Sequence, residues 1–245
     1  MINCYLICGT PRTGSTLLCQ YLTSTGVAGK PESYFRKEDL DAYAEYWQIV
    51  RPDGTYTFAD YLSATRMAGR TENGLLAIRI MGGTLEEMTA ELGQLYPHLA
   101  NDDLGLLEEA FGHLKFIYLR RKDVLAQAIS LYRAEYTDYW HSIEGEAPAE
   151  QPTYDFDKIK ARVDMLHAHN AAWQNWFRAV GVEPLTVQYE ELSADPVGMT
   201  ERVLQFIGVE LPNDARLEAP NQRLADETTR LWMDRFTEEL EGRTT

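Results

Sequence analysis

The sequence has few positive charges for its size, few cysteines and no long apolar segment. Lysine and arginine together number 23, against 38 aspartates and glutamates, so the net charge is −15 at pH 7. A chain this acidic lacks the broad basic face that binds a nucleic acid or an anionic membrane surface. No apolar run approaches the roughly 20 residues that a membrane-spanning helix needs, so no stable membrane insertion is expected.

The three cysteines, Cys4, Cys8 and Cys19, do not form the framework of a disulfide-rich secreted domain. Cys4 and Cys8 would lie about 13 Å apart along one strand, too far for a disulfide bond. The chain also begins without a charged segment followed by a long apolar run, so no signal peptide is expected. Reduced, buried thiols and the missing leader together predict a cytoplasmic protein.

Apolar runs of strand length alternate with stretches of helical spacing along the whole chain. Strands are expected at residues 5–8, 75–81, 115–119 and 183–189. Helices are expected at residues 17–22, 39–50, 58–67, 85–95, 157–180, 199–207 and 231–240, and another after the basic turn at 120–122. This alternation predicts a single α/β domain over residues 1–245, with a mostly parallel central sheet flanked by helices.

The first strand and the first helix are joined by a loop bounded by glycines. Residues 9–16 read GTPRTGST, in which the glycines have the G-x-x-x-x-G spacing of a phosphate-binding P-loop. Glycines let backbone N–H groups turn toward an anion, and the helix adds the positive end of its dipole. The motif therefore predicts a P-loop-type domain, although a tight turn that binds nothing remains the alternative.

This loop lacks the lysine that a nucleotide triphosphatase places directly after the second glycine. Ser15 takes that position, and the cation of the loop is Arg12. Without the lysine, the loop is poorly equipped for the β- and γ-phosphates of ATP. Arg12 and the backbone N–H groups of Thr13, Gly14, Ser15 and Thr16 are suited instead to one terminal oxyanion group.

A second basic turn follows the third expected strand. Arg120, Arg121 and Lys122 precede a helix that carries Gln127 and Ser130. Cations at a helix N-terminus oppose the helix dipole, so three of them indicate an anionic partner; the alternative is an ordinary basic helix start. Loops after parallel strands face one crevice, so the two basic motifs suit a ligand with two separate phosphate-like groups.

Residues 11–18, PRTGSTLL, and residues 26–35, GVAGKPESYF, resemble the opening of the bacterial sulfotransferase family that includes trehalose 2-sulfotransferase. The resemblance implies transfer of a sulfuryl group from PAPS (3′-phosphoadenosine 5′-phosphosulfate) to a hydroxyl of a small acceptor, without a metal ion. The implied acceptor is a carbohydrate such as trehalose or a related glycan or glycolipid. A homodimer is a further family-level expectation.

The same resemblance assigns cofactor contacts. It implies that the loop at residues 9–16 binds the 5′-phosphosulfate of PAPS. Arg121 and Ser130 match the residues that hold the 3′-phosphate, because an arginine at this strand end and a serine on the following helix have that role in the family. Arg223, in a C-terminal loop, matches an arginine that closes on the cofactor.

The acceptor site is expected around the turn after the first helix. Glu32 follows Pro31 in a loop at the same end of the sheet as the P-loop, and a carboxylate there can take the proton of an attacking hydroxyl. The glutamate proposed as base in the trehalose-type enzymes aligns with Ser33 instead. Either the base has moved by one position, or Glu32 is not the base.

Three further residues near this turn have two interpretations each. Tyr34 and Phe35 either form an apolar wall for a sugar or belong to the core. Arg79, an unexpected charge in the second strand, either points into the active site or faces solvent. The acidic segment 135–157 is either a lid over the acceptor or a surface excursion.

These expectations describe a PAPS-dependent sulfotransferase. Arg12 would stabilise charge on the transferred group, and Glu32 would act as the general base. Two alternatives stay open at this stage. One is a small-molecule kinase of the P-loop class, and the other is a protein that binds PAP, the desulfated cofactor, without catalysis. The sequence does not identify the acceptor.

Overall fold

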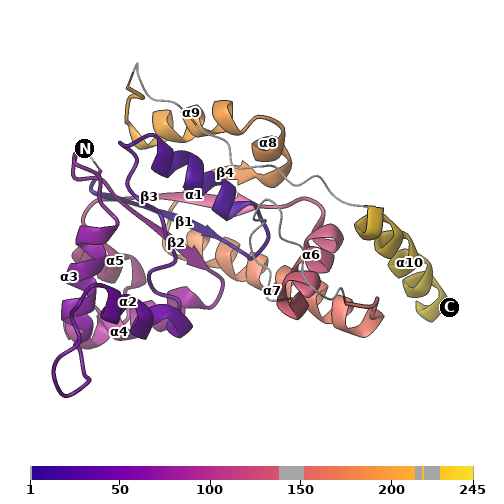
Figure 1. Ribbon diagram of the computed structural model, residues 1–245, viewed down its shortest axis with the longest axis horizontal. Helices are drawn as coiled ribbons and strands as arrows, with labels where there is room; N and C mark the ends of the chain where they lie inside the picture. Colours follow the sequence, from indigo (N-terminus) through magenta and orange to yellow (C-terminus); the bar gives the residue numbers. More distant parts are fainter. Residues whose placement is uncertain (1, 138–151, 213–216, 218–226, 245) are drawn as a thin grey trace.

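The computed structural model describes residues 2–137, 152–212, 217 and 227–244 (Figure 1). At the centre of this part lies a parallel sheet with strand order β2-β1-β3-β4. The strands are β1 (Cys4–Gly9), β2 (Leu76–Met81), β3 (Leu114–Arg120) and β4 (Leu185–Gln188). Because all pairs are parallel, the strands end at the same edge, and the loops that follow them meet there.

Helices cover both faces of the sheet. They are α1 (Ser15–Ser24), α2 (Leu40–Tyr46), α3 (Phe58–Ala68), α4 (Thr84–Leu95), α5 (Asp103–Phe111), α6 (Val124–Thr137), α7 (Phe156–Ala179), α8 (Tyr189–Ala194), α9 (Pro196–Ile207) and α10 (Glu227–Thr244). Short 3₁₀ turns occur at Lys37–Asp39 and Pro97–Leu99. Figure 1 shows α1, α8 and α9 on one side of the sheet and α2–α5 with α7 on the other. The predicted α/β fold with a parallel central sheet is confirmed.

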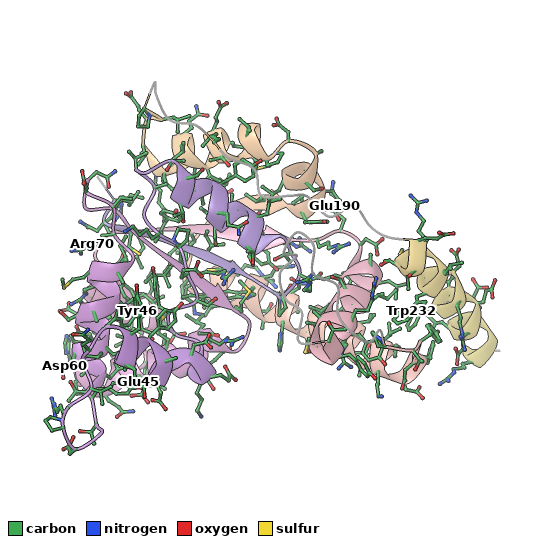
Figure 2. All side chains as sticks on the ribbon, in the orientation of Figure 1. Glu45, Tyr46, Asp60, Arg70, Glu190 and Trp232 are labelled. Carbon is green, nitrogen blue, oxygen red and sulfur yellow. The ribbon has the colours of Figure 1, made fainter. Side chains whose placement is uncertain are left out.

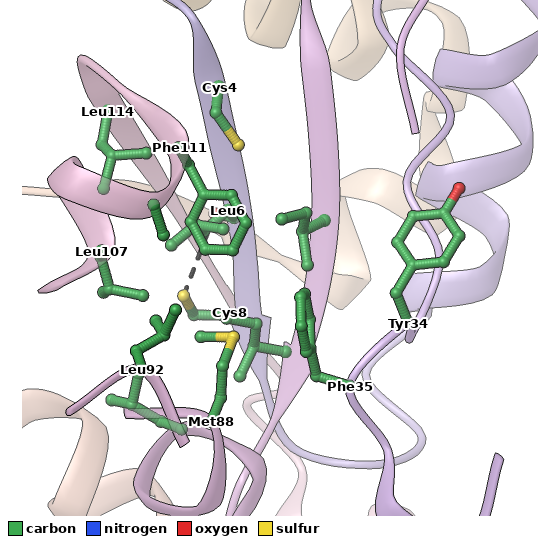
Figure 3. Packing of buried hydrophobic residues seen from close by; sticks show 14 of the residues in the cluster. Cys4, Leu6, Cys8, Tyr34, Phe35, Met88, Leu92, Leu107, Phe111 and Leu114 are labelled. Carbon is green, nitrogen blue, oxygen red and sulfur yellow. Dashed lines mark hydrogen bonds between the residues drawn. The ribbon is translucent and has the colours of Figure 1, made fainter. Parts of the chain in front are cut away.

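Successive residues of β1 point to opposite faces of the sheet and fill two separate cores. Tyr5 and Ile7 pack with apolar residues of α1 and α9. Leu6 and Cys8 pack on the other side with residues of α4, α5 and α7, part of which Figure 3 shows. All of these side chains are fully buried. This two-sided burial explains why the sequence of β1 is apolar throughout rather than alternating.

The structure differs from the sequence prediction at α5 and where β4 gives way to α8. The sequence prediction assigned no helix to residues 96–112, but this stretch contains α5, which begins after Asp102 accepts a hydrogen bond from the backbone N–H of Gly105 (2.9 Å). Leu106, Leu107, Ala110 and Phe111 are buried, and Glu108 and Glu109 are exposed. The last strand stops at Gln188, one residue earlier than expected, because Tyr189 begins α8.

The three cysteines are buried and unbridged, as predicted. Burial raises the pKa of the Cys8 thiol well above its ordinary value. Burial also raises the pKa of Cys19 to about 12, although Arg79 nearby acts in the opposite direction. Among the helices that the structure describes, none is both long enough and apolar enough to cross a membrane.

Candidate active site

The loop between β1 and α1 adopts the backbone conformation that a glycine-bounded P-loop requires. Gly14 precedes α1 with a left-handed conformation (φ 79°). A Cβ atom at this position would lie 2.8 Å from Cδ2 of Tyr189, so both the backbone angle and the available space favour glycine. Arg12 also has a positive φ of 65°, which is uncommon for a residue with a side chain and occurs often at functional sites.

Side chains from α6 and α7 hold the carbonyl groups of this loop. The Nε2 group of Gln127 donates hydrogen bonds to Oγ1 of Thr10 (2.9 Å) and to the carbonyl oxygen of Pro11 (2.6 Å). The indole Nε1–H of Trp173 donates to the carbonyl oxygen of Gly9 (3.0 Å). Gln127 is completely buried, so it supports the loop rather than extending into the crevice beside Ser130.

The two basic motifs meet at the carboxyl edge of the sheet. Nε of Arg12 donates a hydrogen bond to Oγ of Ser130 on α6 (3.0 Å). Nη1 of Arg121 donates to the carbonyl oxygen of Arg12 (3.4 Å). The structure therefore brings Arg12, Arg121 and Ser130 together. Nε of Arg121 is buried and has no hydrogen-bond partner among the described residues, so this guanidinium retains an unsatisfied donor.

Each of the first three residues of α8 contacts the β3–α6 turn. The guanidinium of Arg121 lies over the Tyr189 ring, 4.4 Å from its centroid. The carboxylate of Glu190, labelled in Figure 2, accepts hydrogen bonds from the backbone N–H groups of Lys122 (3.0 Å) and Asp123 (3.4 Å). Oε1 of Glu191 lies 3.9 Å from Nζ of Lys122.

These contacts correct part of the sequence argument. The three cations at the start of α6 predict a bound anion, but Glu190 and Glu191 supply negative charge for Lys122 and for the helix N-terminus. No local pattern predicts this arrangement, because the two glutamates lie 67 or more positions further along the chain. Arg120 and Arg121 have no carboxylate partner among the described residues.

Arg79 links β2 to α1 and to the turn that was expected to bind the acceptor. It donates hydrogen bonds from Nε to Oγ of Ser33 (2.8 Å) and from Nη1 to Oγ1 of Thr16 (3.2 Å). Its Nη2 lies 3.4 Å from Oε2 of Glu32. The Arg79 side chain is 15% exposed, so the solvent-facing alternative is wrong. The Glu32 side chain is 53% exposed and lies beside the P-loop helix.

Tyr34 and Phe35, by contrast, are core residues. Their exposed fractions are 4% and 3%. The Tyr34 ring packs against Tyr43 at a centroid distance of 5.5 Å, and the Phe35 ring packs against Phe111 at 5.9 Å. This burial supports the second of the two interpretations, and we leave both rings out of the acceptor site. Both rings belong to the core cluster that also contains Ile78 and Ile80 of β2 and Tyr61 of α3.

Two predicted features lie outside the described residues. Arg223 is one, and positions 138–151 of the acidic segment are the other. Within the described ranges, no group of three or more His, Cys, Asp or Glu side chains is arranged to hold a metal ion.

A parallel sheet with a P-loop and a second basic turn at one edge defines a P-loop-type fold. The chain matches the Stf0 sulphotransferase family over residues 4–239, and it belongs to that family. The protein is therefore a sulfotransferase enzyme, which confirms the resemblance and decides against the kinase and the non-catalytic alternatives.

Individual relatives agree with this assignment. Trehalose 2-sulfotransferase of Mycobacterium tuberculosis is 28% identical over 257 residues, covering 96% of this chain and 94% of the relative. Trehalose 2-sulfotransferase of Mycolicibacterium smegmatis is also 28% identical, covering 95% and 93%. Among solved structures, the sulfotransferase domain from the curacin biosynthetic pathway aligns with a TM-score of 0.52 at 13% identity, covering 97% of this chain and 98% of that one. That likeness concerns the fold alone.

Proposed function

We propose that this protein transfers a sulfuryl group from PAPS to a hydroxyl group of a carbohydrate such as trehalose. The observation that carries the proposal is the contact between the two anion-binding motifs, through Arg12, Ser130 and Arg121. A donor with a phosphosulfate at one end of a nucleoside and a 3′-phosphate on its ribose suits two linked sites of this kind. The buried Nε–H of Arg121, which has no partner among the described residues, also fits an anion at the second site.

The P-loop would bind the phosphosulfate end of the donor. Arg12 and the backbone N–H groups of Thr13, Gly14, Ser15 and Thr16 lie at or just before the start of α1 and would surround an oxyanion there. PAPS supplies an activated sulfuryl group attached to a phosphate leaving group. Arg12 and these N–H groups would stabilise the negative charge that develops on the leaving oxygen.

Arg121 and Ser130 would hold the 3′-phosphate. A guanidinium can bind phosphate through paired hydrogen bonds, and a serine hydroxyl adds one more donor. Tyr189 and the carbonyl oxygen of Arg12 fix the position of the Arg121 side chain. These residues would thus set the position of the donor and reject nucleotides that lack a 3′-phosphate.

Glu32 is our proposed general base. Of the two positions considered, Ser33 has no carboxylate, and its hydroxyl oxygen accepts a hydrogen bond from Arg79. The Glu32 carboxylate is half-exposed beside α1, and Arg79 orients it through the contact between Nη2 and Oε2. It would receive the proton of the acceptor hydroxyl as that oxygen attacks the sulfuryl group.

The choice of a sugar acceptor is supported by the two relatives that are named trehalose 2-sulfotransferases. Sugar hydroxyls also suit an acceptor site built from Glu32, Ser33 and Arg79, because these groups donate and accept hydrogen bonds.

The first experiment compares thermal stabilisation by PAP, by Mg-ATP and by adenosine 5′-phosphate. A ligand at about a hundred times its Kd adds roughly 2.7 kcal/mol to the free energy of unfolding. We expect stabilisation by PAP alone, and then sulfated trehalose, detected by mass spectrometry, in a reaction with PAPS. Stabilisation by Mg-ATP alone would overturn the choice of donor, and the absence of any sulfated product across a panel of sugars would overturn the choice of acceptor.

A further inference from the structure

A polar pocket of about 370 Å³ lies between the β3–α6 turn, the end of β4 and the middle of α7. Arg120, Arg121 and Lys122 line it from the turn, and Gln188 lines it from β4. His167, with the amides of Asn170 and Gln174, lines it from α7. Neither the P-loop nor Ser130 contributes to its lining, and Arg121 alone, among the described residues proposed to hold PAPS, borders it.

The direction of Arg120 explains why the two sites are separate. Side chains alternate along β3, so Arg120 extends from the same face as Tyr118, which packs against α7. Leu119 extends from the other face and packs in the core beneath α1 and α9. Arg121, after the strand, contacts the P-loop and also borders the pocket, whereas Arg120 belongs to the pocket alone.

The charge of Arg120 has no counterpart within the described part of the chain. Its guanidinium lies 5.6 Å from the centroid of the Tyr118 ring, and there it forms neither a hydrogen bond nor an ion pair. Among the described residues, no carboxylate lines the pocket, although the chain carries 38 aspartates and glutamates. A partly buried cation that lacks an anion is unfavourable, so the pocket is electrostatically suited to an anionic ligand.

The remaining lining indicates what kind of anion fits. The hydroxyl of Tyr118 donates to Oδ1 of Asn170 (3.2 Å), which holds the pocket wall in place. The amides of Gln174 and Gln188 can donate to, and accept from, the hydroxyl groups of a ligand. The volume reaches the lower end of the range for small-molecule sites, about 300 Å³ and above, so a bare sulfate or phosphate ion would fill only part of it.

We propose that this pocket is a second binding site, which takes a phosphate or sulfate monoester of a small hydroxylated molecule. Arg120 binds the anionic group through its planar guanidinium. The amides on α7 and at the end of β4 contact the hydroxylated body of the ligand. The proposal rests on the residues that line the pocket and does not depend on the identity of the sulfuryl donor.

The test uses the full chain with the PAPS crevice saturated by PAP. Glucose 6-phosphate and glucose 6-sulfate are titrated by calorimetry, with glucose as the uncharged control. We expect at least one ester to bind and glucose not to bind. Comparing the two esters distinguishes a phosphate site from a sulfate site.

Variants of Arg120 test whether the ester binds in this pocket. Arg120→Met is expected to abolish ester binding and leave the affinity for PAP unchanged. Arg120→Lys retains the positive charge but lacks the planar guanidinium that forms paired hydrogen bonds. It is expected to weaken ester binding by about tenfold. Arg51→Met is the matched control. Arg51 is an exposed arginine that precedes α3 and pairs with Asp60 of that helix. It makes the same change in net charge and is expected to keep ester binding.

Three results would overturn the proposal. They are the absence of ester binding to the wild-type protein, ester binding that persists in Arg120→Met, and ester binding that PAP displaces. Far-UV circular dichroism and the melting temperature establish whether each variant is folded. If Arg120→Met does not fold, the ester affinity of Arg120→Lys is the deciding measurement. If PAP itself fails to bind, the proposed donor is wrong, but the same titrations without PAP still decide whether the second site exists.

Discussion

Nε of Arg12 donates a hydrogen bond to Oγ of Ser130 at 3.0 Å, although the two residues lie 118 positions apart. Arg12 belongs to the loop after β1, and Ser130 belongs to the helix after β3. The two strands are parallel neighbours in the sheet, so both loops begin at the same edge. This contact makes one crevice out of two motifs that the sequence presents separately.

Replacing Arg12 tests the proposed role of the P-loop. Arg12→Ala should lower turnover with PAPS about 100-fold to 1000-fold, because it removes a cation beside the developing charge. Circular dichroism should show an unchanged fold. Ser130→Ala is the companion variant, expected to weaken PAP binding with a smaller effect on kcat. Near-normal turnover of Arg12→Ala would remove this residue from the active site.

Replacing Glu32 tests the choice of the base. Glu32→Gln should lower kcat by about 100-fold or more, since an amide cannot accept the acceptor proton. Its affinity for PAP, measured by calorimetry, should not change. Glu38→Gln, an exposed glutamate near the same turn, is the control and should be fully active. If Glu32→Gln retains its turnover, another group is the base.

Replacing Glu190 tests whether α8 positions the second anion site. Glu190→Gln weakens the hydrogen bonds to the backbone N–H groups of Lys122 and Asp123, so the turn that carries Arg121 becomes less fixed. We expect about tenfold weaker PAP binding, with kcat at saturating PAPS little changed.

Glu191→Gln is the matched control for this experiment. Within the described part of the chain, the Glu191 carboxylate forms only long, exposed ion pairs with Lys122 (3.9 Å) and Arg202 (3.7 Å), and such pairs contribute little. Equal loss of PAP affinity in both variants would show that the net charge of α8 matters and that the hydrogen bonds of Glu190 do not.

Gly14 and Gly54 form a pair of substitutions that separates backbone strain from steric clash. Both have a positive φ, 79° and 81°. A Cβ atom at Gly14 would meet the Tyr189 ring at 2.8 Å, whereas nothing lies within 4 Å of a Cβ atom at Gly54. Gly54→Ala should therefore cost about 1 kcal/mol, and Gly14→Ala about 2–3 kcal/mol, in denaturant unfolding. Equal costs would contradict the clash.

The buried thiols predict that stability falls in alkaline solution. Burial raises the folded-state pKa of Cys8, and that of Cys19 to about 12, from an ordinary value of 9.0. Above pH 9, the unfolded chain loses thiol protons that the folded protein keeps, so the free energy of unfolding decreases as pH rises. Denaturant unfolding at about pH 8 and about pH 10 measures this decrease.

The variant Cys19→Ala should show a smaller decrease between the two pH values than the wild-type protein. The same burial predicts that a thiol reagent labels none of the three cysteines in the folded protein and all three after unfolding. Rapid labelling of the native protein would contradict the burial of these thiols.

Much of the fold follows from local patterns. The strands and most helices appear in the sequence because buried strands are apolar runs and helices repeat their apolar residues every three to four positions. The helix α5 was missed because its charged, solvent-facing residues masked a short apolar face. Predicting the loop at residues 9–16 succeeded because glycine spacing reports directly on backbone conformation.

The sequence by itself determined the parallel α/β class, the P-loop and the basic turn at Arg120–Lys122, since each is written in neighbouring residues. Only the tertiary structure decided which partner each charge has. Arg79 pairs with Glu32 across 47 positions, and Glu190 supports the turn before α6 across 68. It also decided that Tyr34 and Phe35 are core residues and that Arg120 faces a pocket. Such contacts depend on how distant segments pack, and no local pattern encodes them.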